Sequence, residues 1–334
     1  MGVDPRMSRF KGLDVRLSLL RDWVVYIAAR LFICLIQSLP LETCQRVSRG
    51  LAYLISDLVG MRGQIVDDNL RHAYPHMSPQ QRLRLARQMW EHLVLMLCEI
   101  ALASRKIHQT NWRRHIVIRD KKQVVATFLN PRPTVALTAH FGNFEMLGYI
   151  SGLLGFPTFT IARPLDNRFL DRFLSRHRGA TGQYILPTHG SAEAAQRVLD
   201  AGETLALLGD QYAGPKGCWV EFFGRPASCH KAVALFSLAS GAPLIVMYAQ
   251  RTTGPMRFEV GLAGCADPLD TENRLGSVPD LTQWYNRHLE DIINQMPAQY
   301  WWVHRRWKDT RKQHRRPKPH VHQHKMEWTM GDHP

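Results

Sequence analysis

Residues 134–145 read Thr-Val-Ala-Leu-Thr-Ala-His-Phe-Gly-Asn-Phe-Glu, and this stretch decides the fold class. Its first six residues form a short apolar run that is typical of a buried strand. The run ends in His140, and Gly142 permits a tight turn directly afterwards. Asn143 is a residue type that caps helices, so a helix is predicted to follow it with Glu145 in the first turn. The stretch therefore predicts a strand, a turn and a helix, with polar side chains at the carboxyl end of the strand.

The same alternation continues through the second part of the chain. The predicted strands are 134–139, 158–162, 183–186, 204–209, 244–249 and 257–261, and the predicted helices are 143–154, 167–181, 191–201, 230–240 and 280–295. Strands that alternate with helices of this length predict an α/β fold with a mixed, largely parallel sheet flanked by helices. In open sheets of this kind, functional sites gather at the carboxyl ends of the strands.

Composition divides the chain into five segments. Residues 1–22 are polar and basic, and residues 23–39 are apolar apart from Arg30 and Gln37. The apolar segment is short for a bilayer span, so a membrane anchor and an interfacial helix in one leaflet both remain open. The other three segments are a helical region at 40–111, the α/β core at 112–310 and a basic tail at 311–334 that is predicted to be mobile.

The net charge of +15 indicates an anionic partner, which is either a membrane surface or a nucleic acid. No helix-turn-helix, zinc-finger or RNA-recognition signature accompanies the charge, so nucleic acid is not expected. The six cysteines are not spaced as a metal or disulfide framework and are predicted to be reduced thiols. The alternating histidines of the tail, at 320–324, are not interpreted as a designed site, and no metal is expected.

His140 and Glu145 together suggest acyl-transfer chemistry. A neutral imidazole can take the proton of an acceptor hydroxyl while that hydroxyl attacks an acyl thioester. A carboxylate bonded to the other ring nitrogen fixes the tautomer and stabilises the imidazolium that forms. Glu145 is predicted to reach back to His140 for this purpose. The spacing alone is better explained by a core histidine and a helix-capping glutamate, and the surrounding sequence is what favours the catalytic interpretation.

The surrounding sequence resembles a known family. His140-Phe-Gly-Asn-Phe-Glu145 resembles the H-x-G-N-x-E block of the late acyltransferases of lipid A biosynthesis, the lauroyl and myristoyl acyltransferases of Gram-negative bacteria. That family shares an H-x4-D/E signature with glycerophosphate acyltransferases. Further blocks agree in order and spacing, namely Ala162-Arg-Pro-Leu-Asp-Asn167, Gly209-Asp-Gln211 with Phe222-Phe-Gly224, Gly241-Ala-Pro243 and Gln299-Tyr-Trp-Trp-Val-His-Arg-Arg306. The resemblance covers about residues 20–310.

The resemblance implies roles for individual residues. His140 would be the general base, and Glu145 its orienting partner. Arg163 would bind a phosphate or another anion of the acceptor, since a guanidinium group suits phosphate oxygens. Asp210 and Gln211 follow a predicted strand and would orient either the catalytic pair or the acceptor sugar.

Two further groups complete the candidate list. Asn143 is counted with the substrate-binding candidates because it lies between the predicted base and its partner. Arg305 and Arg306 are expected to meet acidic head groups.

The implied reaction moves a fatty acyl chain from a thioester to a hydroxyl of a lipid A precursor, at the cytoplasmic face of a bacterial inner membrane. The donor would be acyl carrier protein, whose acidic surface suits a basic enzyme, or acyl-CoA. The implied chemistry requires no cofactor. Alternative acceptors are a lysophospholipid, an aminolipid or a glycosylated phosphoinositide, and a non-catalytic membrane or anion-binding protein is the alternative of another class.

Overall fold

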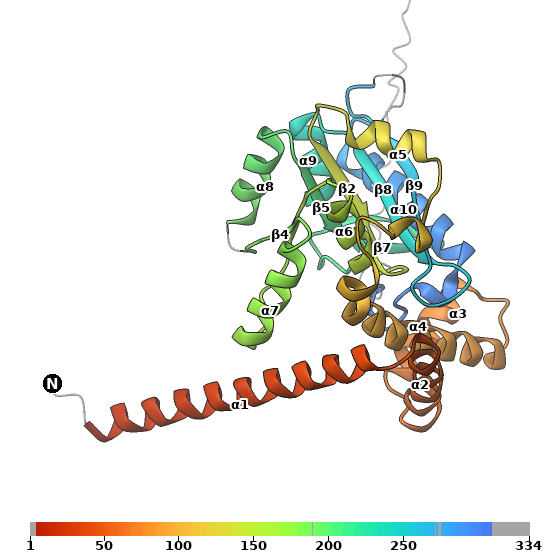
Figure 1. The fold of residues 1–334 in the computed structure, drawn as a ribbon. Helices are drawn as coiled ribbons and strands as arrows, with labels where there is room; N and C mark the ends of the chain where they lie inside the picture. The colour runs from red at the N-terminus through yellow and green to blue at the C-terminus, as the bar shows by residue number, and fades with distance from the viewer. Residues whose placement is uncertain (1–4, 189, 271, 273–274, 309–334) are drawn as a thin grey trace, which may run out of the picture.

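The computed structural model of the chain describes residues 5–188, 190–270, 272 and 275–308. It shows a layered α/β core with a helical N-terminal region that extends along one side of it (Figure 1). The predicted basic tail at 311–334 lies outside the described residues.

The N-terminal region is helical, as the sequence predicts. Its elements are α1 (Pro5–Ser38), α2 (Leu41–Tyr53), a π-helical turn η1 (Leu54–Leu58), α3 (Gly63–Ala73) and α4 (Pro79–Lys106). α1 runs without interruption through the predicted boundary between residues 22 and 23. It ends at Ser38 because the residue before Pro40 disfavours helical geometry. No helix in the described part of the chain combines enough length and apolarity to cross a bilayer.

α1 packs against the rest of the molecule through its polar side chains as well as its apolar ones. The side chain of Asn167, at the start of α7 (Arg168–Gly179), donates to the carbonyl oxygen of Asp22 over 2.8 Å. The Arg30 guanidinium lies 4.7 Å from the centre of the Phe173 ring and donates to the Tyr26 hydroxyl over 3.1 Å. The arginine that interrupts the apolar segment therefore faces α7.

The core contains the predicted mixed, mostly parallel sheet. Its strands are β1 (Ile116–Ile118), β2 (Thr134–Thr138), β3 (Thr158–Ile161), β4 (Gln183–Leu186), β5 (Thr204–Leu208), β8 (Leu244–Arg251) and β9 (Phe258–Ala266), in the spatial order β1-β9-β8-β2-β5-β3-β4. The pair β8–β9 is antiparallel, and the other neighbours are parallel. The sequence did not predict β1, the helix α5 (Lys121–Phe128) or the separate hairpin of β6 (Cys218–Phe222) and β7 (Arg225–Cys229).

Helices cover both faces of the sheet (Figure 1). Successive side chains of a strand point to opposite faces, and β2 shows the result. Val135 and Leu137 pack with α8 (Ser191–Asp200), α9 (Ala232–Ser240) and α10 (Val278–Gln295), whereas Ala136 packs with α4 and α6 (Phe144–Leu153). Because both faces are buried, the central strands are apolar throughout and only their ends can carry exposed chemistry.

Candidate active site

The register of two neighbouring strands brings His140 and Asp210 together. β2 and β5 pair in parallel, with Thr138 opposite Leu208. His140 and Asp210 each follow two residues beyond that pair, so they leave the sheet at the same level of its carboxyl edge. The amide N–H of Gly209 donates to the Thr138 carbonyl over 3.0 Å, which continues the pairing to the last residue before Asp210.

The two side chains make a buried hydrogen-bonded pair. The Nδ1 atom of His140 lies 2.9 Å from Oδ1 of Asp210, and the backbone N–H of His140 donates to Oδ2 of the same carboxylate over 3.0 Å. The Asp210 side chain is fully buried, and 9% of the His140 side chain is exposed. One carboxylate therefore fixes both the ring and the backbone of His140.

The protonation states follow from this contact. Burial by itself would raise the pKa of Asp210, but the contacts with His140 outweigh it and lower this pKa to about 2. Burial lowers the pKa of His140, but the charge and hydrogen bond of Asp210, together with the charge of Glu145, raise it above the ordinary 6.5. With Asp210 ionised, Nδ1–H of His140 donates to it, and Nε2 is the atom left to accept a proton from a substrate.

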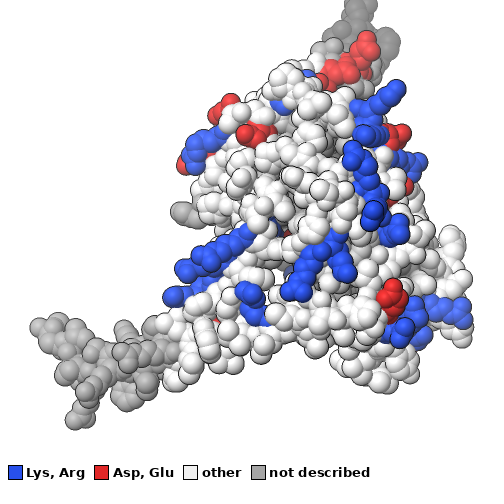
Figure 2. Space-filling model, in the orientation of Figure 1, with Lys and Arg blue, Asp and Glu red and all other residues white. Residues whose placement is uncertain are grey.

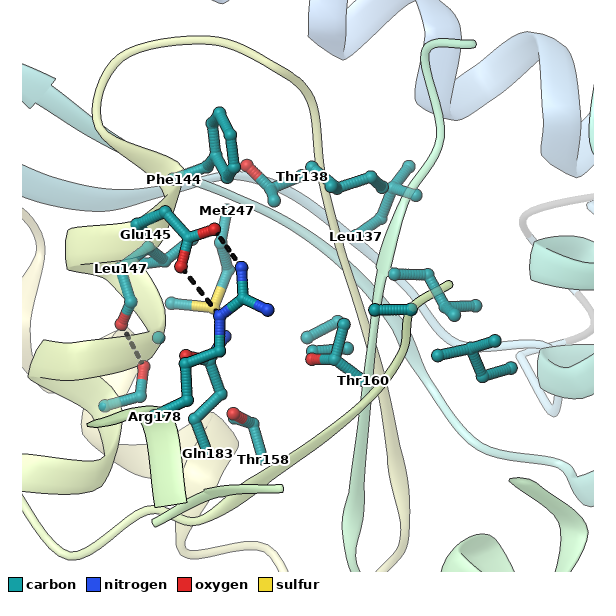
Figure 3. A pocket seen from close by; sticks show the side chains of 18 of the residues that line it. Leu137, Thr138, Phe144, Glu145, Leu147, Thr158, Thr160, Arg178, Gln183 and Met247 are labelled. Carbon is teal, nitrogen blue, oxygen red and sulfur yellow. Dashed lines mark hydrogen bonds and ion pairs between the residues drawn. The ribbon is translucent and has the colours of Figure 1, made fainter. Parts of the chain in front are cut away.

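Glu145 does not make the predicted hydrogen bond to His140. It lies in the first turn of α6, and its carboxylate forms a two-pronged ion pair with Arg178 of α7 (Figure 3). The Nε of Arg178 donates to Glu145 over 3.0 Å in this pair. The prediction was wrong for two reasons. The register of β2 and β5 places the Asp210 carboxylate beside the His140 ring, and the geometry of α6 directs Glu145 toward α7. Glu145 still affects His140 through its charge.

Asn143 is a structural residue and not the predicted substrate ligand. Its Oδ1 accepts from the N–H of Met146 over 3.1 Å, which caps α6, and its Nδ2 donates to Glu99 over 3.1 Å. The residue is completely buried. Both ends of its amide are thus committed to the protein.

A buried polar network supports the turn that follows His140. Glu99 of α4 accepts two hydrogen bonds from Arg251, from Nε over 2.7 Å and from the NH2 group over 2.6 Å. The NH1 group of Arg251 lies 2.7 Å from Nδ1 of His92, and Nε2 of His92 lies 3.0 Å from the carbonyl oxygen of Gly142. Because arginine can only donate, Nδ1 of His92 accepts and its Nε2–H donates to Gly142.

This network requires a neutral His92. Burial, reinforced by the charge of Arg251, holds the pKa of His92 well below its ordinary value. Sequence reasoning missed His92, Glu99 and Arg251. A signal was present, since two polar side chains seven residues apart lie on the apolar side of the helix at 79–106.

An apolar pocket that is partly open to solvent lies beside the pair, and its empty space, open solvent included, is about 740 Å³. Its walls come from α6, α7 and strands β2, β3, β4, β5 and β8 (Figure 3). Phe144 lines it and also contacts His140, with 5.0 Å between the ring centres. The pocket reaches from Thr138 to Thr158, which lie near opposite ends of the pocket in Figure 3. β5 pairs with both β2 and β3. The β5 residues opposite Thr138 and Thr158 are four positions apart, so the two threonines are separated by about 13 Å along the strands.

Comparisons with known proteins show the family of the chain. The sequence profile of the family described as bacterial lipid A biosynthesis acyltransferase matches residues 10–309. The chain belongs to this family of acyltransferases.

The individual proteins to which the chain is similar share only a small part of its sequence. The acyltransferase is 24% identical to the lipid A biosynthesis lauroyltransferase of Escherichia coli over 296 residues, which are 86% of this chain and 92% of the relative. It is 21% identical to the palmitoleoyltransferase of the same organism, over 74% of this chain and 79% of the relative. Among solved structures, it is similar to a 1-acyl-sn-glycerophosphate acyltransferase of Thermotoga maritima, with a TM-score of 0.38 and 12% identity over 78% of this chain and 98% of the other.

The remaining candidates lie at different depths in the acyltransferase. The amide nitrogen of Gln211 is 3.4 Å from Nε2 of His140, so this residue borders the atom that meets the substrate. Arg163 stands apart from the pair: 81% of its side chain is exposed, and it contacts Asp166 over 3.2 Å. Arg306 was predicted to meet head groups, but it is 1% exposed and donates to the Ser228 carbonyl over 2.7 Å, because the last described segment folds back into the core.

Proposed function

We propose that this acyltransferase moves a fatty acyl chain from an acyl thioester to a hydroxyl group of a lipid A precursor. His140 acts as the general base, and Asp210 orients it. The observation that carries the proposal is the buried imidazole whose Nδ1 is held by an ionised carboxylate, beside an apolar pocket that suits an acyl chain. The membership of the chain in a lipid A acyltransferase family supports the choice of acceptor.

The reaction follows from the proton positions. Nε2 of His140 takes the proton of the acceptor hydroxyl while its oxygen attacks the thioester carbon. The carbon–oxygen bond forms, the carbon–sulfur bond breaks, and the imidazolium returns the proton to the leaving thiolate. Asp210 stabilises the imidazolium between these steps, and Glu145 adds a second negative charge nearby.

The apolar pocket is proposed to hold the acyl chain. We propose that the mouth of the pocket lies near Phe144, beside His140, and that its far end lies near Thr158 and Gln183 (Figure 3). A chain that enters past Phe144 therefore runs along the strands toward Thr158. The distance between the mouth and the far end then limits the chain length that the enzyme accepts.

Filling the far end should shorten the preferred chain. Thr158 is 4% exposed and lines the pocket, and we expect the substitution Thr158→Met to move the preferred donor toward shorter chains by two carbons or more. Thr158→Val is the matched control, because it keeps the shape and removes a hydroxyl that has no protein partner among the described residues. The measurement is the initial rate with a series of acyl donors, and the same chain preference in both variants would argue against this use of the pocket.

The donor is proposed to be a fatty acyl chain on acyl carrier protein. Lys and Arg side chains outnumber Asp and Glu on the face seen in Figure 2, and the whole chain carries a net charge of +15. Such a surface attracts an acidic carrier protein at long range. The proposed location is the cytoplasmic face of the bacterial inner membrane, where carrier protein and lipid precursor meet.

Membrane association is proposed to rest on the N-terminal region. Most of the large apolar side chains that the described residues expose lie between residues 17 and 61. Leu31, Phe32 and Leu35 of α1 are each more than half exposed, and Leu58 after α2 is 67% exposed. Apolar side chains on one helical region, with arginines among them, suit the interface of a bilayer that contains anionic lipid.

Polar substitution in α1 should weaken this association. Full burial of a leucine or phenylalanine side chain stabilises by roughly 1.5–3 kcal/mol. We therefore expect Leu31→Ser with Phe32→Ser to lower partitioning into phosphatidylglycerol vesicles by about tenfold or more. The matched control exchanges Val117 and Leu129 for serine, because these residues are equally exposed but lie in the α/β core away from α1. Equal vesicle binding by both double variants would contradict the proposed surface.

The function is tested by lipid mass spectrometry. The full chain is expressed in a Gram-negative host that lacks its own late acyltransferases, and the lipid A species are compared with those of the empty host. We expect a gain of one acyl chain, whose mass also gives the chain length. If the protein is present in the membrane and lipid A is unchanged, the proposed acceptor is wrong, and a new acylated species among the phospholipids or aminolipids of the extract would identify another one.

A further inference from the structure

Two polar atoms beside His140 have no partner among the described protein groups. They are Nε1 of Trp301 and Nε2 of His304, and both are buried from solvent. The ring centre of Trp301 lies 5.0 Å from that of His140, and the ring centre of His304 lies 4.8 Å away. Buried polar atoms are nearly always hydrogen-bonded. These two are therefore suited to a partner that arrives with the substrate.

Backbone contacts fix both rings in place. The N–H of Trp301 donates to the carbonyl oxygen of His140 over 3.0 Å. The amide of Asn69, in α3, donates to the carbonyl oxygens of Trp302 and His304, each over 2.7 Å. The two rings stack on each other with an angle of 19° between their planes. These contacts hold the segment that carries both rings against His140 and α3. Donors placed in advance are what electrostatic stabilisation of a transition state requires.

His304 is suited to act as a neutral hydrogen-bonding group. Burial lowers its pKa, and a positive charge on His140 lowers it further. A positive charge on His140 thus disfavours a second positive charge on His304, which favours the neutral form of His304 when His140 accepts the proton of the substrate. A neutral imidazole donates one hydrogen bond, and an indole N–H can only donate.

The acyl pocket sets where the thioester would lie. Phe144 lines the pocket, and its ring centre is 5.0 Å from that of His140 and 5.4 Å from that of Trp301. With the acyl chain in the pocket, its thioester would lie past Phe144, beside the rings of His140, Trp301 and His304. In that position the base and the two unpartnered nitrogen atoms would all be near the same carbonyl group.

We propose that Trp301 and His304 form the oxyanion hole of the acyl transfer. This inference rests on the proposed function. As the acceptor oxygen bonds to the thioester carbon, its proton passes to Nε2 of His140 and the carbonyl oxygen becomes negative. Trp301 Nε1–H and His304 Nε2–H donate to that oxygen. When the intermediate collapses, an electron pair of the oxyanion re-forms the carbon–oxygen double bond and the carbon–sulfur pair leaves with the sulfur. His140 then gives its proton to the sulfur.

The test uses the purified full chain with a lauroyl thioester of acyl carrier protein and a lipid A precursor. Removal of one oxyanion donor typically lowers kcat by 10²–10³-fold. We expect a loss of about this size for Trp301→Phe and for His304→Leu, with KM for the acceptor unchanged. His304→Gln places an amide N–H near the position of Nε2. We expect its kcat to be at least tenfold higher than that of His304→Leu.

A matched control is available in Trp307. Its indole nitrogen is also buried without a protein partner among the described residues, but its ring contacts His72 and Phe222. Trp307→Phe is therefore expected to keep kcat within a few-fold of the parent. A His304→Gln variant as slow as His304→Leu, or a Trp301→Phe variant as fast as the parent, would overturn the proposal.

A second measurement separates this role from packing. A long-chain trifluoromethyl ketone adds water to form a tetrahedral gem-diol, and one oxygen of this hydrate can occupy the place of the oxyanion. Its affinity should fall in Trp301→Phe and His304→Leu in parallel with kcat, and unchanged affinity in these folded variants would contradict the inference. Failure of the proposed function is distinct: it would appear as an inactive parent chain or as a His140→Ala variant with normal turnover.

Discussion

Replacing His140 with alanine is expected to abolish acyl transfer while the fold and vesicle binding are retained. His140 is the group whose Nε2 is left for the substrate, and the described structure offers no second imidazole held by an ionised carboxylate at this position. A hydroxyl group without a base is a poor nucleophile toward a thioester. We expect turnover to fall by at least 10⁴-fold, because base assistance and the stabilised imidazolium are lost together.

The measurement is the rate of acylation by purified protein, with circular dichroism and vesicle flotation to show that the variant is folded and binds lipid. The substitution removes a largely buried ring that touches Phe144, Trp301 and His304. His140→Gln is therefore a second variant, since it fills more of the space and cannot act as a base. Normal turnover in either folded variant would refute the catalytic role of His140.

The exchange Asp210→Asn should be nearly as damaging. Asp210 accepts from both the backbone N–H and Nδ1 of His140. An asparagine has one acceptor oxygen, and if the backbone N–H takes it, the NH2 group faces Nδ1. The ring then carries its proton on Nε2, where it cannot accept one from the substrate. The same exchange in a Ser-His-Asp triad lowers kcat by about 10⁴-fold, and we expect a similar loss.

The pH profile provides an independent readout of Asp210. A base must be neutral, so activity rises with pH through the pKa of His140, which the parent holds above 6.5. Loss of the Asp210 charge lowers this pKa, and the acid side of the residual profile should shift to lower pH. Glu145→Gln is the comparison, because Glu145 contributes only through its charge and its loss should shift the profile less. An equal shift in both variants would argue against Asp210 as the main partner.

The sequence by itself determined the α/β class, the strand predicted at 134–139 and the position of His140 at its carboxyl end. These follow from local properties: apolar runs of strand length, a glycine that permits the turn, and an asparagine that caps the next helix. The motif Gln299–Arg306 was also visible in the sequence. Its residues alone could not show that the rings of Trp301 and His304 lie next to that of His140, or that Arg306 is buried elsewhere.

Only the tertiary structure decided which carboxylate serves His140. Glu145 is five residues away along the chain, whereas Asp210 is seventy residues away and was one of two candidates for an orienting role. The sequence favours Glu145 because it shows only how far apart residues lie along the chain. The parallel register of β2 and β5 instead places Asp210 level with His140, and the helix places Glu145 on Arg178. Strand order and register arise from packing across the whole core, so no local pattern encodes this pairing.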